Sequence, residues 1–381
     1  LYSFLLLLKG HKTEHVAHYW LSFFIFLGTL YIAPWMLGFA GWYDNQPYRD
    51  FLFYMPFQHL LLMGPAIYFY TQSLLNPAFR FTKRDWLHWL PGILYIAYSI
   101  FVWVYDQLIF KGYFFYADEA DKDFDAWYQY LGFFSMAFYY LKSLRFHNFY
   151  QKMVFQVTSF AESILFRWVR AYLIAFLVLI LMPVIFDIVA LVFPKLQSYT
   201  ASWWFFLLYS IVLYYIAISG YTSPSMGKIP FQVILISHKP ILFIGSLDGL
   251  KNNNTIDVDF EEIPEKTSEE ILRWKPKIEA LFSTEKIYLN PELTLANVAQ
   301  KLNTNISVVS KVINQGFGES FNDFVNQYRV QAVLGKLNSG LYKKETLLGI
   351  ALDCGFNSKA TFNRAFKKIV GLTAIDYIKK L

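Results

Sequence analysis

Polar and basic side chains recur at helical spacing near the end of the chain, between Gly355 and Gly371. Ala360, Asn363, Arg364 and Lys367 follow the spacing of one side of a helix. Guanidinium and amide groups pair with the edges of bases, a small apolar group contacts a thymine methyl, and a lysine suits a phosphate. The other side of this helix is apolar and is expected to be core: Phe362, Ala365, Phe366 and Ile369. The segment therefore predicts an amphipathic helix whose outer face has the chemistry to bind nucleic acid.

A helix-turn-helix motif can position the outer face of a helix against DNA. The sequence contains two copies of this pattern, and the first copy lies between Asn290 and Gln315. Thr294 is a suitable N-cap for its first helix, and Asn303 suits the left-handed residue at its end. A second helix is expected over residues 306–315. The apolar positions of the first helix recur at i, i+3, i+4 and i+7: Leu295, Val298, Ala299 and Leu302. The second helix should point these residues outward: Ser307, Ser310 and Lys311.

The second copy repeats this spacing before the basic helix. Gly355 supplies the turn, Ser358 is the expected N-cap of the following helix, and Gly371 is expected to end it. A helix over 321–338 is expected to fix the distance between the two copies. The apolar face of the first helix in this copy is formed by Leu347, Ile350, Ala351 and Cys354.

Residues 284–381 resemble the DNA-binding domain of AraC/XylS-type transcription regulators, with Ala374 and Ile378 as departures from the family pattern. Tyr328-Arg329-x-x-Ala332 is similar to the linker helix of that family. The remaining resemblance rests on this motif: Gly355-Phe356-x-Ser358-x-x-x-Phe362-x-Arg364-x-Phe366-Lys367-Lys368-x-x-Gly371-x-Thr373-x-x-x-Tyr377.

The resemblance implies that the two outer helix faces enter successive major grooves of double-stranded DNA. The expected base contacts are made by Lys311, Asn363 and Arg364, with Ser307, Ser310, Lys359 and Ala360 in a second rank. The expected phosphate contacts are made by Lys367, Lys368 and Arg329, together with the caps Asn305 and Ser358.

The rest of the chain is apolar enough for a lipid bilayer. Of its 381 residues 56% are hydrophobic and only 16% are charged, whereas a soluble domain has about 25%. Six runs approach the length that spans a membrane, and residues 1–8 are expected to end an earlier span, for a total of six or seven. The runs are Tyr19–Ala40, Phe51–Leu75, Trp86–Tyr105, Ala126–Leu144, Val169–Phe193 and Ser202–Tyr221. The stretch 63–99 also resembles a membrane region that is fused to such DNA-binding domains in some bacterial regulators.

Basic residues in the loops predict the orientation of these spans. Ten Lys or Arg fall in one set of alternate loops and four in the other, which places the first set and the C-terminal region in the cytoplasm. The acidic loop Tyr116–Asp125 then faces outside. Residues after Ser283 carry thirteen cations and seven anions, an excess of six that equals the net charge of the whole chain. The predicted location is the bacterial cytoplasmic (inner) membrane.

The predicted fold is all-α: a multi-span transmembrane helix bundle followed by a cytoplasmic domain of two tandem helix-turn-helix units. The expected domains are 1–222, a connector over 223–282, and 283–381. The connector is expected to be mainly loop, with a helix from Ser268 that Pro276 kinks or breaks.

Other chemistry has weaker support in the sequence. Asp187 lies within an apolar run, where an ionisable group marks a sensing or ligand site unless it lies at the solvated outer interface. His11, His15 and His18 have metal-ligand spacing, but an interfacial histidine cluster explains them better. The chain has no phosphate-binding loop, nucleophile elbow or zinc-protease motif. We expect no enzyme activity, no metal and no cofactor.

Two functions from different classes remain. The favoured one is a membrane-bound transcription regulator whose membrane region is a sensor. Its expected partners are double-stranded DNA, the lipid bilayer, RNA polymerase and an unknown signal ligand. A homodimer is left open. The alternative is a membrane transporter or enzyme body with a regulatory basic tail, for which paired intramembrane charges would be expected. Docking of the tail on anionic lipid is a third reading, distinguished by binding that is blind to DNA sequence.

Overall fold

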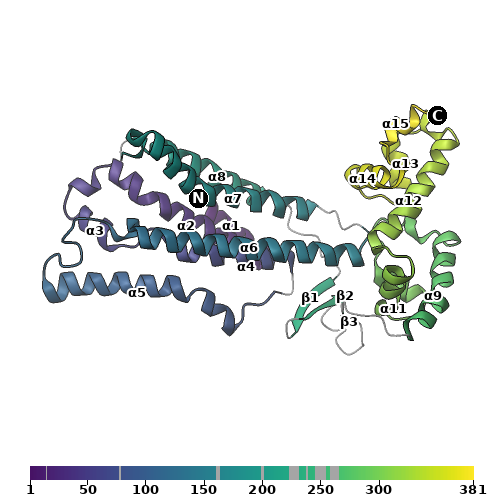
Figure 1. Ribbon diagram of the computed structural model, residues 1–381, viewed down its shortest axis with the longest axis horizontal. Helices are drawn as coiled ribbons and strands as arrows, with labels where there is room; N and C mark the ends of the chain where they lie inside the picture. Colours follow the sequence, from purple (N-terminus) through teal and green to yellow (C-terminus); the bar gives the residue numbers. More distant parts are fainter. Residues whose placement is uncertain are drawn as a thin grey trace. The chain divides into compact units, whose positions relative to one another are not determined.

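The computed structural model describes the chain in nine stretches, shown as ribbons in Figure 1. These are residues 1–13, 15–76, 79–159, 164–198, 201–222, 231–236, 239–244, 255–257 and 266–381. The described residues are nearly all helical, which confirms the predicted fold class.

The chain folds into two compact units. The first consists of Leu1–His147 with Trp168–Gly227, and the second of Asn148–Arg167 with Lys228–Leu381. The expected boundaries differ from this division, because the residues that follow His147 group with the C-terminal unit and not with the apolar helices. The reason is a set of hydrogen bonds that Thr158 and Ser159 make with the C-terminal unit.

The first unit is built of helices joined by short helical turns. Its α-helices are α1 (Tyr2–Thr13), α2 (Val16–Phe39), α3 (Tyr48–Tyr54), α4 (Leu60–Leu75), α5 (Leu90–Val104), α6 (Ala126–Val157), α7 (Ile164–Val192) and α8 (Trp203–Thr222). The end of α6 and the start of α7 belong to the second unit. Short 3₁₀ turns lie at Trp42–Asp44, Lys83–His88, Lys122–Phe124 and Pro194–Gln197, and a π-helical turn at Tyr105–Phe110.

Four described helices are long and apolar enough to cross a membrane: Val16–Phe39, Leu90–Phe110, Trp168–Val192 and Trp203–Thr222. Each overlaps a predicted span. The predicted span Ala126–Leu144 lies in α6, which does not meet this standard, and α4 is apolar but shorter.

The predicted single span Phe51–Leu75 is wrong, because the chain divides there into α3 and α4. Pro56 lies in the break, and a proline restricts the residue before it and donates no amide hydrogen bond. The buried carboxylate of Asp123 accepts the amides of Phe57 and Gln58 at 2.7 and 2.9 Å. The break is thus stabilised by a side chain from a distant loop.

Further buried carboxylates stabilise the part of the first unit around this break. Asp123 also accepts the hydroxyl of Tyr95 at 2.6 Å, and Asp121 accepts that of Tyr43 at 3.3 Å. Asp106 accepts the hydroxyl of Tyr54 at 3.1 Å. Burial, followed by the nearby Asp123 carboxylate, raises the pKa of Asp121 to about 8.

Helix α2 packs against α1, α4 and α8 within the first unit. Gly28 lies where α2 crosses α8, and a Cβ there would overlap the side chain of Leu213. A small residue at a helix crossing allows close approach of the backbones, as is common between membrane helices.

The connector contains structure that the sequence analysis missed. Three antiparallel strands, β1 (Phe231–Ile236), β2 (Lys239–Ile244) and β3 (Thr255–Asp257), form a sheet in the order β1-β2-β3. Helix α9 (Lys266–Ser283) then continues through Pro276, so of the expected kink or break at this residue the break does not occur.

The C-terminal region consists of the two expected helix-turn-helix units. The first contains α10 (Leu295–Lys301) and α11 (Ile306–Lys311), which continues as a π-helical turn, Val312–Gly316. The second contains α13 (Leu347–Asp353) and α14 (Lys359–Val370), followed by α15 (Ala374–Ile378). Helix α12 (Phe321–Asn338) joins them and has the predicted bounds (Figure 1).

Local backbone chemistry sets these boundaries as predicted. The hydroxyls of Thr294 and Ser358 accept amides of the first turns of α10 and α14. Asn303 has a φ of 52°, and Gly371 ends α14 with a φ of 81°. Gly355 has a φ of 90°, and a Cβ there would also overlap the carbonyl oxygen of Tyr288. Glycine is therefore required at this turn for both backbone and packing.

Candidate nucleic-acid interface

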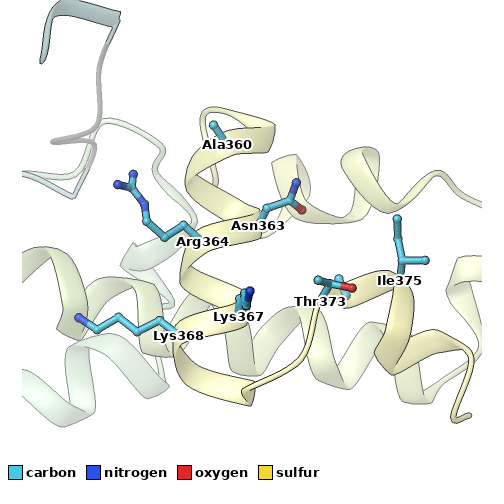
Figure 2. Close-up of a pocket in the computed structure, with 8 residues that line it drawn as sticks. Ala360, Asn363, Arg364, Lys367, Lys368, Thr373 and Ile375 are labelled. Atoms are coloured by element: carbon cyan, nitrogen blue, oxygen red, sulfur yellow. The ribbon is translucent and has the colours of Figure 1, made fainter. Parts of the chain in front are cut away.

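Helix α14 has one buried and one exposed side, as its sequence predicts. Phe362 and Phe366 are buried in a core that α12 and α13 share. The predicted contact residues are all exposed on its other side: Lys359, Ala360, Asn363, Arg364, Lys367 and Lys368. Figure 2 shows Arg364 and Lys368 projecting from the same side of the helix, and Asn363 from the side that faces Thr373 and Ile375.

A groove of about 640 Å³ brings five of these residues together with the start of α15. It is lined by Ala360, Asn363, Arg364, Lys367, Lys368, Thr373, Ala374 and Ile375. Thr373 and Ile375 were not predicted as contact residues, although Thr373 belongs to the family motif. The hydroxyl of Thr373 accepts the amide of Asp376, so α15 begins at Ala374, one of the two departures from the family pattern.

Helix α11 presents a smaller face. Ser307 is exposed and Ser310 is half-buried, with its hydroxyl accepting the side-chain amide of Asn314 at 3.3 Å. Lys311 is half-buried as well, and its ammonium lies 3.2 Å from a carboxylate oxygen of Glu270 on α9. The residues of α11 do not share the groove of α14, since α12 separates the two copies (Figure 1).

Lys368 also has an ionic partner within the unit. Its ammonium lies 2.6 Å from a carboxylate oxygen of Asp323 at the start of α12. The lysine side chain is 63% exposed and the aspartate side chain 38%, so DNA phosphates can compete for this lysine at a modest energetic cost. The pair leaves the phosphate role of Lys368 open.

Arg329 does not occupy the position that a phosphate contact requires. Only 1% of the residue is exposed, and burial lowers the pKa of its guanidinium to about 10. It donates to the carbonyl oxygens of Tyr288 and Asn290 at 2.8 and 2.7 Å. We therefore correct the expected role: Arg329 stabilises the fold by joining α12 to the start of the first helix-turn-helix unit.

Asp187 lies in the first unit, on an exposed side of α7, five residues before the helix ends at Val192. The predicted sensing role stays a prediction. Among the described residues, no three His, Cys, Asp or Glu side chains are grouped as metal ligands.

The second helix-turn-helix unit has the arrangement that DNA recognition requires. Its exposed helix is narrow enough for the major groove, which is about 12 Å wide, and its donors project from the protein. Arg364 and Asn363 are both exposed on α14, and their residue types can make bidentate contacts with guanine and adenine.

Comparisons with known proteins agree with this geometry. Residues 298–380 match a family described as a helix-turn-helix domain (HTH_18). A 92-residue stretch, 24% of the chain, is 29% identical to uncharacterized HTH-type transcriptional regulators of Staphylococcus aureus strains COL, MSSA476 and N315. The chain covers about 12% of the length of these relatives. No solved structure matches the chain. The C-terminal part of the chain thus carries a helix-turn-helix DNA-binding domain of the kind found in transcription regulators, joined to a region with several apolar helices.

Proposed function

We propose that the chain is a membrane-bound one-component transcription regulator that binds specific promoter DNA through its two helix-turn-helix units. The observation that carries this proposal is the pair of helices α11 and α14, one in each copy, joined by the single helix α12. Helices at a fixed separation suit successive major grooves on one side of a duplex.

The charge distribution supports this proposal. The net charge of +6 resides entirely after Ser283, and an excess of cations attracts the DNA backbone. The excess of basic residues in one set of loops supports a cytoplasmic location for the same region, where bacterial DNA is accessible. The expected location is the inner membrane, and RNA polymerase is the expected protein partner of the bound regulator.

The apolar unit would act as the sensor. A signal molecule, or a change in the bilayer, controls DNA binding only if it has different affinities for two states of the protein. Asp187, an exposed carboxylate on α7, is the position in this unit that we propose for such a signal. We propose no enzymatic activity, and a homodimer would extend the DNA site by a second pair of helices.

The experiment that tests this function is a binding-site selection on random duplex DNA with the full chain in lipid nanodiscs. Arg364→Ala and Lys311→Ala variants are selected in parallel. An enriched motif with two segments about one helical turn apart, each degraded by one variant, supports the proposal. Salt-sensitive binding to every duplex alike would contradict it and favour a tail that docks on anionic surfaces.

A further inference from the structure

The DNA-binding unit includes a second, distant piece of the chain. Asn148–Arg167, which contains the end of α6, belongs to the same compact unit as the two helix-turn-helix copies. Thr158 and Ser159, directly after α6, are both completely buried there. We name the stretch Asn148–Ser159 the α6 extension.

Ser159 uses all its backbone and side-chain polar groups in this contact. Its amide donates to the carbonyl oxygen of Leu293 at 3.1 Å. Its carbonyl oxygen accepts the side-chain amide of Asn322 at 2.9 Å and a guanidinium nitrogen of Arg329 at 3.4 Å. Its hydroxyl accepts a second nitrogen of Arg329 at 3.1 Å.

Thr158 adds a short stretch of sheet pairing. It forms an antiparallel bridge with Thr294, the N-cap of α10, and its carbonyl oxygen lies 3.3 Å from the Asn322 side-chain nitrogen. The contact is therefore made with both the first helix-turn-helix copy and the linker helix α12. Since Asn322 and Arg329 are buried, their donors require these acceptors.

The α6 extension also faces the second copy. A cavity of about 990 Å³ has residues of the extension on one side and residues of α14 and the start of α12 on the other. Phe149, Lys152 and Gln156 line it from α6, and Arg364 and Lys368 line it from α14. The extension is thus adjacent to all three parts whose arrangement determines the spacing of the two recognition helices.

We propose that the α6 extension is a clamp that sets the distance between the two helix-turn-helix copies, and that its release is how the membrane unit lowers DNA binding. This inference rests on the proposed function and adds the contact through which regulation acts. Its chemical basis is that Thr158 and Ser159 supply acceptors for the linker helix. Without them the side-chain amide of Asn322 and the Nη1 of Arg329 lose their partners, whereas Arg329 keeps its bonds to Tyr288 and Asn290.

Disulfide crosslinking in the full chain tests the docking directly. Bridged residues in antiparallel strands lie at a Cα separation that a disulfide accepts, so a Thr158→Cys/Thr294→Cys variant should crosslink on oxidation. The one native cysteine, Cys354, is buried. A Thr158→Cys/Thr346→Cys variant is the matched control, because Thr346 is the N-cap of α13 in the second copy. Failure of the first pair to crosslink would overturn the clamp.

The control of DNA binding is tested by adding Asn322→Ala to the crosslinkable pair in nanodiscs. We expect the reduced form of this triple variant to bind the selected motif about tenfold more weakly than the reduced Thr158→Cys/Thr294→Cys protein. We also expect it to lose its preference for the native half-site spacing over a spacing lengthened by about two base pairs. Oxidation should restore both properties. An unchanged affinity in the reduced form, or a loss that the crosslink does not restore, would overturn the proposal.

Failure of the proposed function has a different signature. If the selection enriches no motif, the chain is not a sequence-specific regulator, yet crosslinking still reports whether the α6 extension is docked. If a motif is enriched and the crosslink forms without affecting spacing preference, the DNA-binding function stands and the clamp does not.

Discussion

The Lys311 ammonium and the Glu270 carboxylate lie 3.2 Å apart, so the best candidate for base recognition on α11 is held by α9. DNA must compete with Glu270 for this lysine. We expect Glu270→Gln to raise the affinity for the selected motif a few-fold, with the gain falling at high salt. Titration of nanodisc-embedded protein with labelled duplex at two salt concentrations measures it.

Glu285→Gln is the matched control for Glu270→Gln. It removes the same charge, but Glu285 pairs with Lys301 at the end of α10 and not with the recognition helix. An equal gain in both variants would show that only net charge matters, and Lys311 would lose its special role.

Arg364→Ala should weaken discrimination at one base position by about 1–3 kcal/mol, since a guanidinium that reads a guanine edge has no substitute in alanine. Lys367→Ala should instead weaken binding to all sequences alike and reduce the slope of log affinity against log salt by about 0.9. Competition assays with single-base variants of the motif separate the two effects. Identical profiles for both variants would contradict the assigned roles.

Gly355→Ala should destabilise the second helix-turn-helix copy by at least about 2 kcal/mol, because it combines a left-handed backbone with overlap of the Tyr288 carbonyl oxygen. Gly340→Ala separates these contributions, since Gly340 also has a positive φ but nothing lies near its missing Cβ. Gly335→Ala, in the interior of α12, should be neutral or stabilising. Hydrogen exchange of amides in α12–α14 measures all three, and equal effects of the first two would refute the packing argument.

Asp121 should make the stability of the first unit depend on pH. Its pKa of about 8 exceeds the unfolded value of about 3.9, so the folded protein binds more protons between them. The contribution of Asp121 to the stability of the first unit is then fully present below about pH 4 and decreases as pH rises to 8, by at most about 1.4 kcal/mol per pH unit. Asp121→Asn should flatten this dependence.

Thermal unfolding followed by tryptophan fluorescence measures the pH effect in the first unit, because all tryptophans except Trp274 lie there. Asp118→Asn is the control. Asp118 is exposed and pairs with Lys122, which lowers the pKa of its carboxyl, so its contribution is lost only as pH falls below about 4. A pH profile that Asp121→Asn leaves unchanged would contradict the role of Asp121.

Features determined by nearby residues were predictable from the sequence. Thr294 and Ser358 cap helices through their own neighbours, and Gly355 and Asn303 adopt left-handed turns that their residue types favour. The bounds of α12 also agree with the helix expected over 321–338 between the two copies. From these features the two helix-turn-helix copies and the exposed face of α14 could be predicted.

Features that depend on distant residues were not predictable. Arg329 resembles a phosphate-binding residue in sequence, but a buried partner 170 residues away makes it structural. The break before α4 depends on Asp123, 65 or more residues further along. The ion pair of Lys311 likewise joins α11 to a helix 41 residues earlier. Hydrophobic periodicity contains no information on such pairings.

The burial of Ser159 has a consequence for any event that cuts the chain. Since Ser159 precedes two apolar helices and Arg329 follows them, the DNA-binding unit is assembled from two parts of the gene product that the membrane region separates. A protease that severed the connector would liberate a tail without Ser159, whose Arg329 and Asn322 donors must then bind water. The liberated tail would be a different molecule from the tethered one, with its own preference among promoters.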